Sequence, residues 1–223
     1  MKEEEWARTD VWADVLGMVP LPLSVRKLQL WIIAICRLGW NERDPSELIY
    51  VMDQIEKFVD RSISHQEYVR AIDFADYILD QEKHNHIAEI LSNIHYCQIG
   101  DLYGIGQLRY NIDNMWSEPT PLIADMARDI FGNPYRPVTF EPSWQTSTAT
   151  AVARQMYDSR EFSLMPILAD ALQDAGCECP EVLDHCRDPK GIHARGCWVA
   201  DHVLGLAERP VRKNGPEKPE SST

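Results

Sequence analysis

The chain has 223 residues, of which 44% are hydrophobic, enough for one sizeable core or for two small helical lobes that share an interface. Its 35 acidic side chains outnumber 22 Lys and Arg, and the formal charge of -13 repels phosphate backbones, so we expect no direct nucleic-acid binding. The longest apolar run, Leu28 to Leu38, is too short for a bilayer span, and the first residues lack the pattern of a signal peptide. We therefore expect no membrane association and a cytoplasmic location.

Helix signals recur along the first half of the chain, whereas strand signals are scarce. A central helix is predicted from Ser24 or Val25, because apolar residues follow at helical spacing as far as Leu38. Asp44 is predicted to cap a second helix that has proline at its first position, and the segment from Ser64 to Glu67 has the pattern of a capping box. Helical spacing continues over residues 84–108, where three glycines predict a kink or break.

Shorter helices and a proline-rich connector are predicted for the second half. A helix over 121–131 is expected to stop at Gly132, and the prolines up to Pro142 predict an extended connector. The helices expected beyond it run from Ser147 or Thr148 to about 158, over 165–175, over 180–186, and from about 194 to 204. From Glu208 the sequence has almost no apolar residues, which predicts a disordered tail.

Together these patterns predict an all-α protein. We expect a helical-hairpin or bundle lobe over residues 1–118, a connector over 119–142, a small helical lobe containing cysteine and histidine over 143–207, and a tail over 208–223.

Cysteine and histidine are concentrated in that second lobe. Four of the six cysteines lie between Cys177 and Cys197, and a reducing compartment favours free thiols over disulfides. Thiolate and imidazole are the preferred ligands of zinc, so this density suggests a zinc site. The candidate ligands are Cys177, His185, Cys186, His193 and Cys197. The last two lie four residues apart and could share a helical face if the final helix begins early.

Two other interpretations of the same residues stay open. In the one that we favour, the cysteines are small apolar core residues and the histidines cap helix ends or bind carbonyl groups, so that no cofactor is required and zinc is the alternative. In the other, a histidine activates a cysteine nucleophile. His185 and Cys186 cannot form that pair, because adjacent residues of a helix point about 100° apart.

Several segments of the second half have a distinctive sequence. Residues 128–138 read RDIFGNPYRPV, residues 165–177 read MPILADALQDAGC, and HCR at 185–187 is followed by HARGCWV at 193–199. These segments resemble an uncharacterised planctomycete-type paralogous family, specifically over about 128–206 and more loosely before that. The resemblance implies a stand-alone helical protein with no established activity or cofactor. It places the five candidate ligands on motif positions and excludes Cys179.

The leading functional hypothesis is a non-enzymatic interaction or accessory protein, in which packed helix pairs present a groove to a protein partner. The alternative is a zinc-binding module, structural or hydrolytic. A hydrolytic site would need an open coordination position and an acid such as Asp184 or Asp201. A third hypothesis is a component of a larger nucleoprotein or defence assembly, in which the acidic chain binds the basic surface of another protein.

Overall fold

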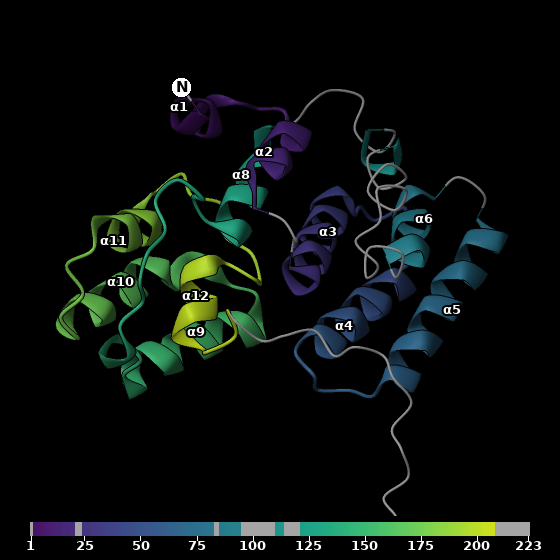
Figure 1. Ribbon diagram of the computed structural model, residues 1–223. Coiled ribbons are helices and arrows are strands. Elements are labelled where there is room, and N and C mark those ends of the chain that lie inside the picture. The colour runs from purple at the N-terminus through teal and green to yellow at the C-terminus, as the bar shows by residue number, and fades with distance from the viewer. Residues whose placement is uncertain (1, 21–23, 83–84, 95–109, 114–120, 208–223) are drawn as a thin grey trace, which may run out of the picture.

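The structure is a computed structural model that describes residues 2–20, 24–82, 85–94, 110–113 and 121–207. Within these ranges the chain forms helices and no strand, which confirms the all-α prediction (Figure 1). The longer helices are α3 (Val25–Gly39), α4 (Glu47–Val59), α5 (His65–Gln81), α6 (His86–Asn93), α8 (Pro121–Phe131), α9 (Ser147–Ser159), α10 (Met165–Asp174) and α11 (Pro180–Arg187). The shorter ones are α1 (Lys2–Arg8), α2 (Trp12–Met18) and α12 (Trp198–Val203).

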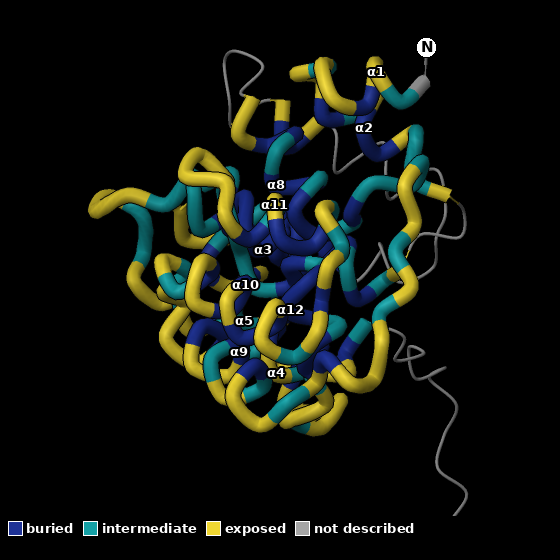
Figure 2. The backbone as a smooth tube through the Cα atoms, turned by 90° about the vertical axis from the view of Figure 1, so that its left-hand side faces the viewer, coloured by how far each residue is buried: buried dark blue, intermediate teal, exposed yellow. Residues whose placement is uncertain are grey.

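The buried apolar side chains form two separate clusters. The first cluster is built by α1 to α6 together with α8, and the second by the helices from α9 to α12. Figure 1 shows α3 to α6 on one side of the molecule and α9 to α12 on the other, with α8 between them. In Figure 2 the dark blue, buried part of the chain runs through the interior along α3. Thus α8, which begins at Pro121 and so lies well after α6 in the sequence, completes the first cluster.

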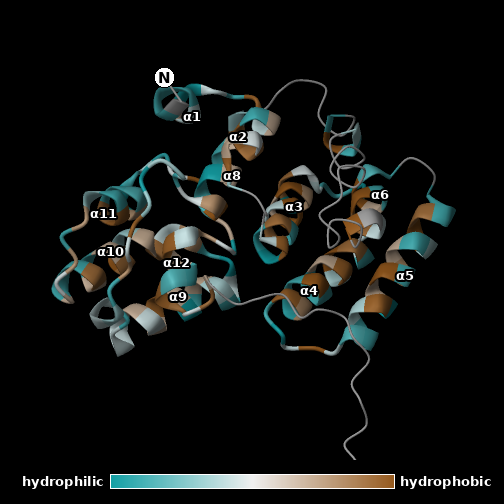
Figure 3. Ribbon diagram, in the orientation of Figure 1, coloured by the Kyte–Doolittle hydropathy of each residue, from teal (hydrophilic) through white to brown (hydrophobic). Residues whose placement is uncertain are grey.

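Local sequence explains most of the helix boundaries. The Ser24 hydroxyl accepts a hydrogen bond from the backbone nitrogen of Lys27 at the start of α3, and Ser64 and Glu67 form the predicted capping box of α5. At the end of α8, Gly132 adopts a φ of 71°, a conformation that favours glycine. Figure 3 shows that α3, α4 and α6 are rich in hydrophobic residues, as a central helix and its neighbours require.

Two predicted helix starts are wrong. Helix α4 begins at Glu47, and the Asp44 carboxylate does not cap it: that side chain accepts hydrogen bonds from Asn41 and Asn85 instead. Helix α12 begins at Trp198 rather than near residue 194, because Gly196 adopts a φ of 101°, which no helix accommodates. Helices α1 and α2 had no counterpart in the sequence prediction. The predicted kink after residue 94 and the tail lie outside the described residues.

A buried ionic network joins the two clusters. The Arg26 guanidinium of α3 donates hydrogen bonds to Asp201 of α12 and, at 3.0 Å, to Asp60 at the end of α4. Arg195 also binds Asp60, and the Tyr157 hydroxyl donates to Asp201. The residues that continue the network to the surface are Arg37, Asp53, Glu56 and Arg160. With four arginines and four carboxylates its charges balance, which is what makes their burial tolerable.

None of the helices in the described part of the chain has the length and apolar character needed to cross a bilayer.

Candidate metal centre

Four potential metal ligands from three separate segments converge where α8 meets the second cluster. They are Asp129 near the end of α8, His185 on α11, His193 in the segment before α12, and Cys197 immediately before α12. One ligand atom of each lies within 4.8 Å of all the others. This group, which we call the Asp-His-His-Cys cluster, could hold a metal ion.

The Asp129 carboxylate is the centre of the cluster. Its Oδ1 atom lies 2.8 Å from Nδ1 of His193 and 3.2 Å from Nε2 of His185. Its Oδ2 atom accepts a hydrogen bond of 2.9 Å from the backbone nitrogen of Ala194. Burial by itself would raise the pKa of Asp129, but the hydrogen bonds from His185 and His193 lower it below the ordinary value. The side chain is therefore ionised and fixed in orientation, with Oδ1 facing the two imidazoles.

The Cys197 thiol completes the cluster from within the protein interior. Its Sγ atom lies 3.2 Å from Nε2 of His185, and the residue is fully buried. Burial raises the pKa of this thiol well above its ordinary value, and the negative charge of Asp129 raises it further. A divalent cation bound between the two groups would reverse this effect, because it favours the thiolate.

One polar atom of the cluster lacks a partner. The Nε2 atom of His193 is buried and has no hydrogen bond to any residue that the structure describes, while its Nδ1 atom faces Asp129. Its ring packs edge-on against the ring of His185, with 4.9 Å between the centroids. Buried polar atoms without partners are rare in folded proteins. The hydrogen bonds of the cluster therefore do not by themselves satisfy His193.

The turn before α12 depends on two glycines. A Cβ atom on Gly196 would lie 3.0 Å from Cδ1 of Leu30 on α3, so the positive φ and the close approach both require glycine. The backbone nitrogen of Gly196 also donates to the Tyr157 hydroxyl over 2.9 Å. At Gly191 a Cβ atom would lie 2.8 Å from Nε2 of His193. These contacts fix the segment that presents His193 and Cys197 to the cluster.

Three residues of the cluster, Asp129, His185 and His193, line a cleft of about 460 Å³ that opens to solvent, whereas Cys197 does not line it. Asp129 and His193 line its inner part, where both side chains are largely buried, whereas 20% of the His185 side chain is exposed. Three acidic side chains, Asp125, Asp184 and Asp188, and two basic ones, Arg128 and Lys190, line the rest of the cleft. With Asp129 the acidic groups are in excess, which favours the entry of a cation over that of an anion.

Three of the five ligands predicted from the sequence lie in the cluster, namely His185, His193 and Cys197. Cys177 and Cys186 lie in the second apolar cluster instead, both buried, and burial raises the pKa of Cys186 to about 12. The fourth member, Asp129, was not predicted. An acid on the buried face of α8, three residues after Met126 and one before Ile130, was the signal that could have found it.

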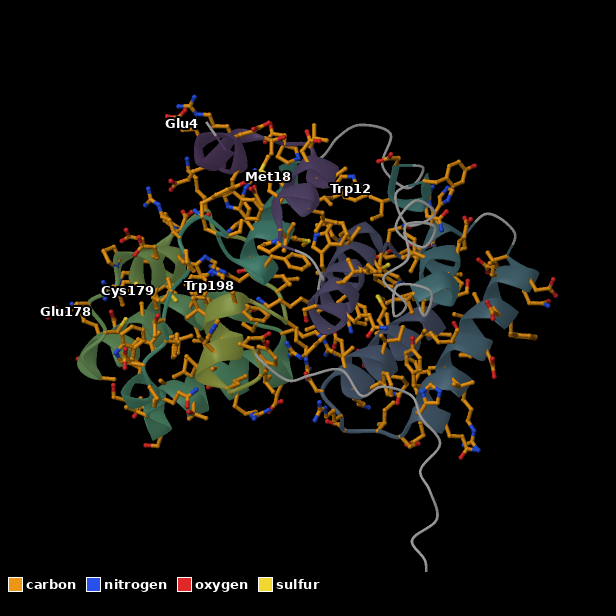
Figure 4. The ribbon with its side chains drawn as sticks, in the orientation of Figure 1. Glu4, Trp12, Met18, Glu178, Cys179 and Trp198 are labelled. Carbon is orange, nitrogen blue, oxygen red and sulfur yellow. The ribbon has the colours of Figure 1, made fainter. Side chains whose placement is uncertain are left out.

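The other residues that sequence analysis considered lie elsewhere. Cys179, labelled in Figure 4 near the outer edge of the lobe formed by α9 to α12, contacts Glu181 with its thiol and does not belong to the cluster. His193 and Cys197 do not share a helical face, because both precede α12. Asp201 is engaged by Arg26 and Tyr157, whereas Asp184 is exposed and lines the cleft.

Comparison of the chain with protein-family models, with curated proteins and with solved structures finds no match. The resemblance to the planctomycete-type family stays a prediction.

Proposed function

We propose that this protein binds one zinc ion through Asp129, His185, His193 and Cys197, and that the ion has a structural role. The observation that carries the proposal is the convergence of four ligand atoms, from segments as far apart in sequence as α8 and α12, within 4.8 Å of one another. Asp129 belongs to the helix that completes the first apolar cluster, whereas the other three precede or lie within helices of the second. The ion would join the two clusters.

The donor set favours zinc over other common ions. Two imidazole nitrogens, one sulfur and one carboxylate oxygen suit zinc, whereas magnesium and calcium prefer oxygen alone. In a tetrahedral zinc site, neighbouring ligand atoms lie roughly 3.3 to 3.6 Å apart, as the usual bond lengths imply. Nε2 of His185 lies 3.2 Å from both Sγ of Cys197 and Oδ1 of Asp129, and Nδ1 of His193 lies 2.8 Å from the same oxygen, which is close to this range. The remaining pairs of ligand atoms lie within 4.8 Å, so binding of the ion would require side-chain shifts of up to roughly 1 Å.

A structural role is favoured because four protein ligands fill a tetrahedral shell. Catalytic zinc sites usually have three protein ligands and keep the fourth position for water or substrate. A hydrolytic site would require one ligand of the cluster to dissociate. Asp184, which is exposed and lines the cleft, could then act as the acid, whereas Asp201 is bound to Arg26.

Metal analysis of untagged protein tests the proposal. We expect about one equivalent of zinc per chain, and less than about a tenth of an equivalent, with none taken up on addition, would contradict it. Cobalt substitution should give the ligand-field bands of a tetrahedral site and a thiolate charge-transfer band. Cys197→Ser should abolish the charge-transfer band and release zinc. Cys179→Ser, which removes a thiol outside the cluster, is the matched control and should leave both unchanged.

The interaction role predicted from the sequence stays a prediction, and one surface favours it. Tyr50 of α4 and Tyr77 of α5 are 55% and 59% exposed, and the ring of Phe74 lies between them at 6.4 and 6.3 Å. Exposed aromatic residues are common in protein interfaces. A variant with Tyr50→Ser and Tyr77→Ser should lose proteins that co-purify with the wild type in both low and high salt. An unchanged set would count against this role.

A further inference from the structure

A second cleft shares Arg128, Asp184 and His185 with the cleft of the metal cluster. It has a volume of about 620 Å³ and is bordered by the start of α3, the end of α8, the segment 132–138, α11 and α12. This volume falls within the range of small-molecule sites, roughly 300 to 1,000 Å³. The residues that line it come from both halves of the chain, so its shape depends on the packing of the two apolar clusters.

Flat apolar side chains form the walls of this cleft. Trp6, Phe131 and Trp198 line it, together with Pro134. The indole of Trp198, labelled in Figure 4, packs closely against Gly132, where an added Cβ atom would lie 3.3 Å from it. The His185 ring lies on it as well, with 5.3 Å between the ring centroids. Rigid aromatic walls of this kind favour a planar, apolar ligand body.

Three Lys and Arg side chains line the cleft, and two of them have partners. Arg128 donates to the backbone oxygens of Trp6 and Thr9 and to Asp125, and Arg136 pairs with Glu3. Lys27 has neither a hydrogen bond nor an ion pair from its ammonium group to any other residue that the structure describes.

The surroundings of Lys27 make its charge costly in the absence of a ligand. Burial lowers the pKa of Lys27, although the Asp201 carboxylate, which is engaged by Arg26, acts in the opposite direction. A half-buried ammonium group beside aromatic walls loses hydration without gaining a direct partner. An anionic group in the cleft would supply that partner through a charge-assisted hydrogen bond.

We propose that this cleft binds a small aromatic monocarboxylate, with the carboxylate at the Lys27 ammonium and the ring against Trp198 and Phe131. A single charge is favoured because Glu181 and Asp184 also line the cleft and would repel a polyanion such as a nucleotide. The proposal goes beyond the metal-binding function. The groups that would contact the ligand, Lys27 and the aromatic walls, are not members of the Asp-His-His-Cys cluster, although His185 of that cluster also lines the cleft.

Calorimetric titration of the full chain with 2-naphthoate, and with its neutral analogue 2-naphthamide, tests the proposal. We expect saturable one-site binding of naphthoate and at least about tenfold weaker binding of the amide, since a hydrogen bond to a charged group contributes on that scale. Lys27→Met should weaken naphthoate binding about tenfold or more and leave the amide unchanged. Lys27→Arg should keep the preference for the acid. Lys57→Met, which removes an exposed lysine of α4, is the matched control.

Binding of acid and amide with equal affinity, equal affinities of wild type and Lys27→Met for naphthoate, or no saturation below about 1 mM would overturn the proposal. Circular dichroism and zinc content of each variant show whether it folds. His193→Ala separates the two proposals: it should lose zinc and still prefer naphthoate over the amide. A wild-type protein without zinc that binds naphthoate would contradict the metal-binding function alone.

Discussion

Asp129 is the residue that connects the metal cluster to the first half of the molecule. Its carboxylate contacts His185, His193 and the backbone of Ala194, all from the segment between α11 and α12 or from α11 itself. The side chain is only 2% exposed, and an ionised carboxylate at such a position needs positive charge or several hydrogen bonds beside it. A bound dication would supply that charge directly.

Asp129→Asn should lower zinc affinity at least about tenfold, because substitutions of residues around a bound metal commonly have effects of this size. The amide keeps an oxygen that can accept from Ala194 but carries no charge for the ion. Competition with a chromophoric chelator measures the affinity. Asp158→Asn, at an exposed position of α9 outside the cleft, is the control and should bind as the wild type does. Equal affinities for Asp129→Asn and wild type would remove Asp129 from the ligand set.

Gly196 is the second position at which a single residue decides the local structure. Gly196→Ala should destabilise the fold by about 1 to 3 kcal/mol, because its φ of 101° is strained for alanine and the methyl group would meet Leu30. Gly17→Ala is the control: nothing lies within 4 Å of its added Cβ atom in α2, and alanine is the better helix former there. Urea unfolding measures both. A Gly196→Ala variant as stable as the wild type would show that the turn can relax.

Among the helices, the start of α5 has the most complete cap. Glu67 accepts a hydrogen bond of 2.8 Å from the Ser64 backbone nitrogen and another from its hydroxyl, and these bonds lower the pKa of Glu67. A carboxylate whose pKa is lowered on folding stabilises the protein at pH values above its unfolded pKa. That contribution is lost as the pH falls through the folded pKa.

We therefore expect Glu67→Gln to be less stable than the wild type at pH 7, with a difference that shrinks as the pH falls below about 4.5, the ordinary pKa of glutamate. Thermal unfolding at a series of pH values measures it. Glu42→Gln, at an exposed position before α4, removes the same charge without a cap and should show no such trend. A difference independent of pH would mean that the carboxylate charge does not act through the cap.

Helix ends that depend on local sequence could be predicted, whereas those that depend on tertiary packing could not. The starts of α3 and α5 and the end of α8 could be predicted because each depends on residues within one turn of it. The start of α12 could not, since the packing of Gly196 against Leu30 spans the molecule. Likewise His185, His193 and Cys197 stood out by composition, whereas Asp129 lies 64 residues from His193 and joins them only through the tertiary fold.

At the scale of the whole molecule, two links span the boundary between the apolar clusters. One is the metal cluster, and the other is the ionic network in which Arg26 binds Asp201 and Asp60. The side chain of Asp201 has no exposed surface, and that of Arg26 is 6% exposed. A buried pair of this kind adds little net stability compared with apolar packing, but removing one partner leaves the other charge buried and unpaired.

Arg26→Met should accordingly cost about 3 to 5 kcal/mol of unfolding free energy, because among the described residues Asp201 then keeps only the Tyr157 hydroxyl as a side-chain hydrogen-bond donor. Arg26→Met combined with Asp201→Asn should recover part of that loss. Arg187→Ala is the control, since its partner Asp170 is 71% exposed and such pairs contribute about 0 to 1 kcal/mol. Urea unfolding with and without a chelator measures all three.

The same experiment tests whether the two links act together. If zinc and the Arg26 network hold the same boundary, removing the second link should cost less once the first is gone, because the clusters then already separate during partial unfolding. The chelator should therefore lower the stability of Arg26→Met by less than that of the wild type. Strict additivity would mean that each link stabilises its own cluster, and the ion would then have no part in joining α8 to α12.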